Sequence, residues 1–250
     1  MKIRLFLWLM IIPIMVFLAS CSKSTEPTDS MNMSEYYPTS IGSWWKYDTW
    51  SLDSNGTRIE ITSRDSIVSS GTITLKGKNV PLFLAWNLDY IGKSDTTEYY
   101  YAEGSILYAY MPATMSSFLK PGRDTSSWKW GLFADMNGTN WTIINDSLSK
   151  DTLGYTVKQT LKMTGTKGTQ KNYSIKGKTI QSQQFIYNFK LKTTAYLLGQ
   201  VFSSFDNEMQ IEFWYGKGVG LVNQITRIIK DEGMNLGVNR ETILIDYNIK

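Results

Sequence analysis

Apolar and polar residues alternate along most of the chain from about residue 36 to the end. The alternation is regular in four stretches, at 155–163, 185–192, 209–215 and 243–249. In the second and fourth, the apolar positions are Phe185, Tyr187, Phe189 and Leu191, and Ile243, Ile245, Tyr247 and Ile249. A period of two with one polar face is typical of antiparallel strands that bury one side. The pattern therefore predicts an all-β fold.

Short turn signals separate many of these stretches. They are Asn55-Gly56, Ser70-Gly71, Glu103-Gly104, Asn137-Gly138 and the stretch 164–169, which holds two glycines. Asn-Gly supplies the positive φ that tight hairpins require. Many short strands joined by such turns indicate a single antiparallel meander, as a curved sheet or half-barrel. We expect at most two short helices, at 113–119 and 194–205.

The N-terminus has a different composition. Two cations, Lys2 and Arg4, precede an apolar run over 5–19 that Pro13 interrupts. The run is shorter than the roughly twenty residues of a membrane-spanning helix and has the length of the apolar part of a secretory signal. It ends in the sequence Leu18-Ala19-Ser20-Cys21, which resembles the lipobox of bacterial lipoproteins.

This resemblance implies cleavage between Ser20 and Cys21, with lipid on the Cys21 thiol that holds the protein at a membrane. Ser22 stands where lipoproteins retained at the inner membrane carry Asp, which implies the cell outer membrane. Residues 22–34 are polar and turn-rich, as in a flexible tether. We therefore expect a signal peptide over 1–20, a tether over 21–35 and one β-rich domain over 36–250.

Composition removes several kinds of chemistry. Cys21 is the only cysteine, and the chain has no histidine. Intramolecular disulfides, thiolate metal clusters, imidazole-based triads and zinc sites with histidine are therefore excluded. We expect no catalytic residue, no metal and no cofactor. Loss of Lys2 and Arg4 with the signal lowers the formal charge from +4 to +2, and this balance gives no support to nucleic-acid binding.

Two short sequences near the ends of the expected domain carry a second resemblance. The first is the run 37–47, YPTSIGSWWKY, and the second is the run 214–222, WYGKGVGLV. They resemble the opening and the close of a set of uncharacterised bacterial envelope lipoproteins. The resemblance implies a β-rich domain, curved like the lipoprotein carriers and without an assigned activity. This chain departs from that pattern at Gly216-Lys217, where an aliphatic or Ala-Pro pair is usual.

Both runs also have a purely structural interpretation. Trp45 and Tyr47 share one face of a strand because they are two residues apart. Three glycines at alternate positions allow a β-bulge or the close approach of a neighbouring aromatic ring. These glycines are Gly216, Gly218 and Gly220.

Aromatic residues make up 14% of the chain and include adjacent ones such as Tyr99, Tyr100 and Tyr101. Neighbours in a strand point to opposite faces, so some rings leave the core unless both faces are covered. Such rings can stack on sugars or line a cavity for acyl chains. The alternative is that a curled sheet uses the rings as core.

Charge is segregated along the chain. No acidic residue occurs from Thr152 to Phe205, although this segment is rich in lysine. Adjacent hairpins can bring such lysines onto one face, which would attract anionic lipid, acidic polysaccharide or an envelope protein. The alternative is a solvated face whose lysines discourage edge pairing. The candidate partner face consists of Lys158, Lys162, Lys176, Lys178, Lys190 and Lys192.

Three functions follow, in decreasing order of support. The first is non-enzymatic binding or scaffolding in the cell envelope by a lipid-anchored domain with the lysines as its partner face. The second is a carrier or chaperone that shelters a lipid or another apolar ligand in an aromatic-lined concavity. The third is a carboxylate-based hydrolase, which is disfavoured because acidic residues such as Asp53, Asp135 and Asp146 cluster in expected turns.

Overall fold

The computed structural model describes residues 32–87, 92–95, 99–112, 114, 127–152, 154–233 and 236–250 of the 250-residue chain. Residues 31–250 form one compact unit. Within the described part, no helix has both the length and the apolar character needed to span a membrane.

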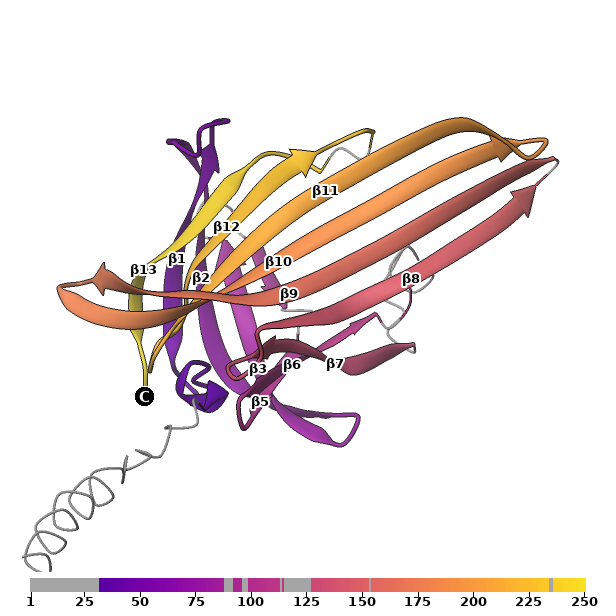
Figure 1. The fold of residues 1–250 in the computed structure, drawn as a ribbon. Coiled ribbons are helices and arrows are strands. Elements are labelled where there is room, and N and C mark those ends of the chain that lie inside the picture. Colours follow the sequence, from indigo (N-terminus) through magenta and orange to yellow (C-terminus); the bar gives the residue numbers. More distant parts are fainter. Residues whose placement is uncertain are drawn as a thin grey trace, which may run out of the picture. The chain divides into compact units, whose positions relative to one another are not determined.

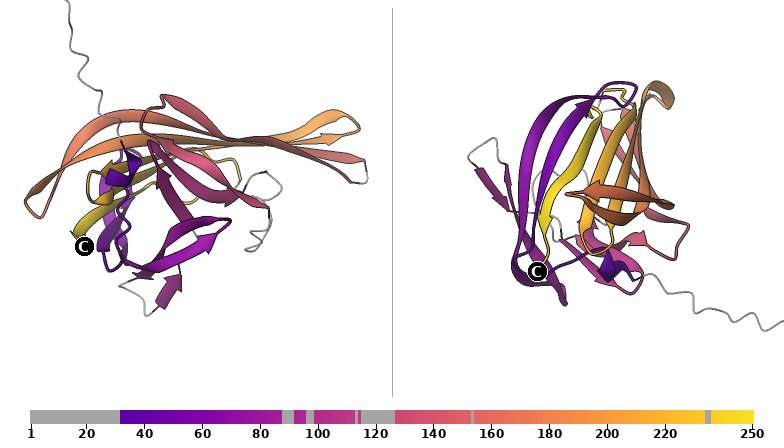
Figure 2. Two further views of the ribbon diagram at one scale, coloured as in Figure 1. Left: turned by 90° about the horizontal axis from the view of Figure 1, so that it is seen from below. Right: turned by 90° about the vertical axis from the view of Figure 1, so that its left-hand side faces the viewer.

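Ten strands of the described residues form a large curved sheet (Figures 1 and 2). Each strand pairs with the next in the order β4 (Gly92–Asp95), β3 (Lys78–Asn87), β2 (Arg58–Leu75), β1 (Trp44–Leu52), β13 (Arg240–Asn248), β12 (Gly220–Lys230), β11 (Gln200–Gly216), β10 (Lys178–Leu197), β9 (Tyr155–Ile175) and β8 (Asn140–Thr152). The sheet is open, with β4 and β8 at its edges.

A second sheet has three strands, in the order β5 (Tyr99–Glu103), β6 (Ile106–Pro112) and β7 (Trp128–Asp135). Every strand pair in both sheets is antiparallel, so the predicted all-β antiparallel fold is confirmed. The meander is divided, because the chain leaves the large sheet after β4, builds the small sheet and returns at β8.

The main core lies between the two sheets. Phe185 and Tyr187 of β10 pack against Phe133 of β7, and the Tyr187 and Phe133 rings stack with centroids 4.7 Å apart. The predicted inward positions of β10, from Phe185 to Leu191, are all buried. The core also includes Met33 of a short 3-10 helix, η1 (Met33–Glu35). The folded unit therefore starts at or before Asn32, earlier than the boundary at residue 36 expected from the sequence.

In β13 the predicted alternation assigns residues to the wrong face in one part of the strand. Leu244 is buried and Ile245 is 42% exposed, although the alternation places Ile245 inside. The cause is a β-bulge, since Lys46 pairs with Asp246 whereas the next residue, Tyr47, pairs with Leu244. The extra residue reverses the side-chain parity of one half of the strand relative to the other.

Three of the five expected turns are confirmed and two are wrong. Asn55-Gly56 and Asn137-Gly138 lie between consecutive strands, and Glu103-Gly104 joins the last residue of β5 to the turn before β6. Ser70-Gly71 lies inside β2, at a register shift opposite β3. The stretch 164–169 lies inside β9, where its glycines serve packing instead of a turn.

Gly165 shows why a glycine occurs inside β9. It pairs with Trp141 of β8 on one side and with Tyr187 of β10 on the other. The indole of Trp141 lies over the Gly165 backbone, so that a Cβ at residue 165 would overlap the ring. The absent side chain makes room for an aromatic ring, as glycines in strands often do.

The expected helix at 194–205 is wrong. Residues up to Leu197 belong to β10, those from Gln200 belong to β11, and the turn Leu198-Gly199 joins the two strands. A register shift after Ala195 interrupts the alternation there, which is why the strand pattern is weak. The other expected helix, at 113–119, lies outside the described residues except for Thr114.

Candidate functional site

The two end sequences that resemble envelope lipoproteins meet in the folded unit. Trp45 of β1 donates a hydrogen bond from its indole Nε1 to the backbone oxygen of Val219, at 2.6 Å. The Tyr47 phenol donates to the backbone oxygen of Leu221, at 3.0 Å. Both pairs are 174 residues apart in the sequence, so the opening and the close of the domain are held together by these aromatic side chains.

A cavity of about 180 Å³ opens beside this junction. Strands β1, β2, β3, β5, β11 and β12 contribute to its wall, together with the segment that precedes β1. The lining residues are Tyr37, Pro38, Trp45, Tyr47, Ile67, Phe83, Tyr100, Phe213, Tyr215, Gly220, Leu221 and Gln224. We call it the aromatic cavity, since seven of these residues carry aromatic rings.

Edge-to-face contacts fix several of the rings. Tyr37 lies against Phe83 and Tyr100, with centroid separations of 6.1 and 6.0 Å, and Trp45 lies 5.8 Å from Phe83. Aromatic pairs in this arrangement add to the free energy of burial and restrict ring rotation. The aromatic cavity is therefore largely formed in the absence of a ligand.

The glycines of the closing sequence shape one wall. The expected bulge is confirmed by a register shift between Trp214 and Tyr215. The side chain that approaches Gly216 is aliphatic instead of aromatic, because a Cβ there would come within 2.6 Å of Ile180 Cγ2. Gly220 has φ +97°, a conformation that side chains rarely adopt, and it lies against Pro38.

The aromatic cavity carries little charge. Burial raises the pKa of the Tyr47 phenol, with a further contribution from nearby Tyr215, so Tyr47 is neutral at physiological pH. Its hydroxyl and the Trp45 indole nitrogen are used in the bonds to the β12 side. Among the lining residues, Gln224 alone carries a side-chain amide. The wall can therefore contact an apolar group, and the Gln224 amide adds a polar contact.

The lysines of the predicted partner face are all exposed, but they form two sets. Lys176 lies in the β9–β10 turn and pairs with Asp246 at 2.5 Å, and Lys178 is the first residue of β10. Lys158, Lys162, Lys190 and Lys192 lie toward the opposite ends of β9 and β10. Lys162 and Lys176 are fourteen residues apart on an extended strand, or roughly 45 Å, so the six lysines do not form one patch.

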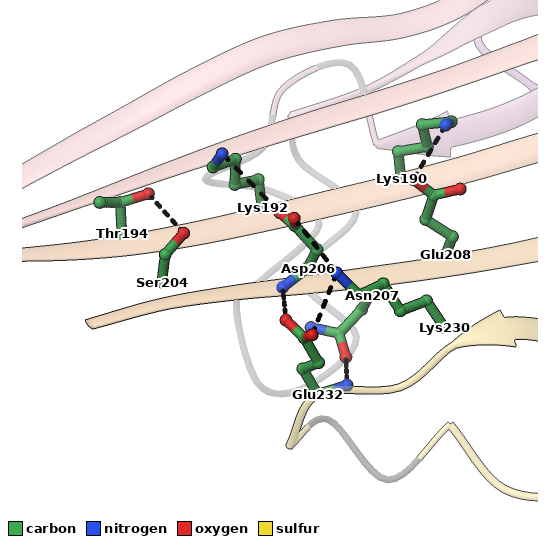
Figure 3. A network of polar contacts seen from close by, with 9 residues as sticks. All are labelled: Lys190, Lys192, Thr194, Ser204, Asp206, Asn207, Glu208, Lys230 and Glu232. Carbon is green, nitrogen blue, oxygen red and sulfur yellow. Dashed lines mark hydrogen bonds and ion pairs between the residues drawn. The ribbon is translucent and has the colours of Figure 1, made fainter.

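Two lysines of the second set, Lys190 and Lys192, lie beside acidic side chains of β11 (Figure 3). Lys190 pairs with Glu208 at 2.9 Å, and Lys192 lies 4.0 Å from Asp206. Asp206 also pairs with Lys230 of β12, at 3.5 Å. The sequence did not reveal this compensation, because the acids begin at residue 206, directly after the acid-free segment, and the hairpin brings them back beside the lysines.

The remaining predicted positions are the lipobox residues and the carboxylates of expected turns. Ser20 and Cys21 lie outside the described residues. Asp53 and Asp135 accept hydrogen bonds from backbone amides two residues later, as expected of turn carboxylates, whereas Asp146 lies within β8 instead of a turn. In the described part of the chain, no group of three or more Asp, Glu, His or Cys residues is arranged to hold a metal ion.

No protein-family model and no curated protein matches this chain. Two crystal structures resemble it in fold. A candidate lipoprotein from Parabacteroides distasonis has 14% identity and a TM-score of 0.46, and a candidate exported protein with a YmcC-like fold from Bacteroides fragilis has 8% identity and a TM-score of 0.44. Each match covers 85% of this chain and 98% of the other. Similarity at this level carries no functional inference.

Proposed function

We propose that this protein is a lipid-anchored, non-catalytic protein of the cell outer membrane that binds a small apolar ligand in the aromatic cavity. The lipid would be attached to Cys21 after cleavage of the leader. The domain would hold its ligand at the membrane to which it is anchored.

The observation that carries the proposal is the aromatic cavity itself. Apolar concavities with a few polar groups are the usual form of small-molecule sites. Here the rings of Trp45, Phe83 and Tyr100 face a shared space, and the Gln224 amide offers a hydrogen bond to a polar end of the ligand. The core packing on either side keeps this space from collapsing.

The volume limits the kind of ligand. An engineered cavity of about 150 Å³ holds one benzene molecule, and this cavity is about 180 Å³. It therefore fits a single ring or a short alkyl segment. A full-length acyl chain would extend beyond it, so we expect short apolar molecules or the end of a longer chain.

Native mass spectrometry of the secreted chain, produced from Ser22 onward, tests the proposal. We expect an adduct that leaves on denaturation, or, for a protein purified empty, saturable binding of toluene or hexanoic acid in calorimetry. Ile67→Trp fills the aromatic cavity and should abolish binding. Ile59→Trp, on the same strand but exposed, is the matched control and should bind normally.

Two results would contradict the ligand-binding role. One is a wild-type protein without an adduct that binds neither probe. The other is binding that survives Ile67→Trp. The anchoring part is tested separately with Cys21→Ala in the full chain, which should prevent lipid attachment and signal cleavage at this position. Unchanged acylation and unchanged outer-membrane fractionation of this variant would overturn it.

A further inference from the structure

The end of the β10–β11 hairpin exposes an unusual amount of apolar surface. Leu198 is 87% exposed and Phe202 is 70% exposed. The residues that share this exposure at the end of the hairpin and on adjacent β9 are Tyr155, Leu198, Val201, Phe202 and Phe205. We call them the arm tip, because β8–β11 run together beyond the rest of the sheet to this end (Figures 1 and 2).

Apolar residues of the arm tip lie on both faces of the sheet. Val201 pairs directly with Tyr196, so these two share one face. Leu197 pairs with Tyr155 of β9, and this pair lies on the opposite face because Leu197 follows Tyr196. The turn residue Leu198 is almost fully exposed between the two strands. Apolar surface therefore surrounds the end of the hairpin.

The turn sequence itself points to a role outside folding. Among the described residues, three hairpins use a two-residue turn with positive φ at both positions, Lys76-Gly77, Lys176-Gly177 and Leu198-Gly199. Positive φ is unfavourable for a bulky residue such as leucine. The other two turns carry lysine, which suits an exposed position, whereas Leu198 buries almost nothing in the fold.

Cations lie behind the apolar end. Lys158 pairs with Thr194, and its ammonium lies 5.2 Å from the Tyr196 ring. Lys192 precedes Thr194 by two residues on β10 and so lies further from the turn. Thr194 is four residues from Leu198, or roughly 13 Å along the strand. An apolar end followed by lysines at this spacing matches an interfacial segment, whose apolar part enters by about 5–10 Å while its cations meet the headgroups.

We propose that the arm tip inserts into the surface of an anionic phospholipid bilayer. A protein partner with a flat surface would cover one face of the hairpin and leave the other face exposed to solvent. A bilayer would surround both faces and the turn. Lys158, which lies opposite Thr194 and beside the Tyr196 ring, places a cation close to the apolar end, and this favours an anionic surface. This contact is separate from the lipid on Cys21 and from the aromatic cavity.

Vesicle sedimentation tests the proposal with the chain from Ser22 onward, which has no lipid and keeps every described residue. The wild type should bind vesicles of phosphatidylcholine with phosphatidylglycerol, and bind less to phosphatidylcholine alone. Leu198→Ser with Phe202→Ser should lower the partition coefficient at least about tenfold. The matched control is Ile59→Ser with Val238→Ser, which removes two other exposed apolar side chains (63% and 57%) and should leave binding unchanged.

A second variant separates insertion from folding. Leu198→Lys installs the residue that the chain itself uses in its two other turns of this geometry, so the fold should be kept while binding falls. In addition, the form that starts at Ser22 has no cysteine, so Phe202→Cys allows labelling at one site with an environment-sensitive fluorophore. Its emission should shift to the blue on anionic vesicles, whereas a label at Lys176→Cys, in a different hairpin, should not respond.

Three results would overturn the proposal. The first is a wild-type chain that binds neither vesicle type. The second is equal binding by the wild type and the Leu198→Ser/Phe202→Ser variant. The third is self-association through the arm tip without any fluorescence shift on vesicles, which would assign this surface to a second copy of the chain.

Discussion

The phenol of Tyr187 donates a hydrogen bond to the backbone oxygen of Phe133, 3.0 Å away. This bond joins β10 of the large sheet to β7 of the small sheet, and the two aromatic rings stack beside it. The same backbone oxygen accepts a second bond, at 2.9 Å, from the Trp141 indole of β8. The junction of the two sheets therefore combines aromatic packing with satisfied polar groups.

Tyr187→Phe should lower the free energy of unfolding by about 1 kcal/mol, the usual net value of one hydrogen bond. The loss should be no larger, because Trp141 still satisfies the Phe133 oxygen and the ring is kept. Urea unfolding measures it. Tyr155→Phe, at an exposed position, is the control and should change stability by less than about 0.5 kcal/mol. A Tyr187→Phe protein as stable as the wild type would contradict this account of the junction.

Gly165→Ala should destabilise the protein by about 1–3 kcal/mol, because the added methyl group overlaps the Trp141 ring. Gly71→Ala is a matched control in another strand, since no atom lies within 4 Å of the position of its Cβ. In denaturant unfolding the control should be nearly neutral. Combining Gly165→Ala with Trp141→Leu should cost less than the sum of the two single variants. Additive losses would show that the overlap is not the cause.

Local patterning predicted much of the fold. The positions from Phe185 to Leu191 alternate without interruption, and β10 buries the expected face. The failures occur where one extra residue enters a strand. The bulge near Ile245 and the register shift after Ala195 both break the period of two, and a period read along a single strand cannot show which partner strand produces the break.

The aromatic cavity was harder to predict than the strands. The sequence singled out Trp45, Tyr47 and the glycines near Gly220, but it did not connect them, because the contact spans 174 residues. Phe83 and Phe213 also line the cavity, and no local signal distinguishes them from ordinary core residues. The strand order that places β1 beside β13, and so near β12, supplies this information.

Stability should fall steeply in alkaline solution. Burial raises the pKa of the Tyr47 and Tyr187 phenols above the ordinary value of 10.0. Because the pKa of each phenol is higher in the folded than in the unfolded state, the buried neutral phenol contributes fully to the free energy of unfolding below about pH 10. This contribution is lost as the pH rises toward the folded-state pKa. Each such phenol should lower the free energy of unfolding by about 1.4 kcal/mol per pH unit above pH 10.

The measurement is urea unfolding at several pH values between about 9 and 11, with tyrosinate absorbance recorded alongside. Tyr47→Phe should reduce the slope of the free energy of unfolding against pH by the amount that corresponds to one proton. This holds whatever the effect of the substitution on stability at neutral pH. Tyr155→Phe removes an exposed phenol and should leave the slope unchanged. Ionisation of Tyr47 near pH 10 without unfolding would show that its phenol is not sealed from water.

Lys162→Glu should stabilise the protein, although it removes a charge from the predicted partner face. Lys162 of β9 lies directly opposite Lys190 of β10, and Lys190 pairs with Glu208 of β11 on its other side. Like charges opposite each other are unfavourable, so the substitution replaces a repulsion with a second attraction across the three strands. The gain should be about 0.2–1 kcal/mol, as for exposed pairs.

The control is Lys158→Glu. Lys158 faces Thr194 instead of a cation, and its ammonium lies near the Tyr196 ring, so this substitution should be neutral or slightly destabilising. Thermal unfolding at low and at about 1 M salt distinguishes the two, since screening should remove most of the gain for Lys162→Glu. If both substitutions have the same effect at both salt concentrations, the change in stability comes from net charge. The repulsion between Lys162 and Lys190 would then not be its cause.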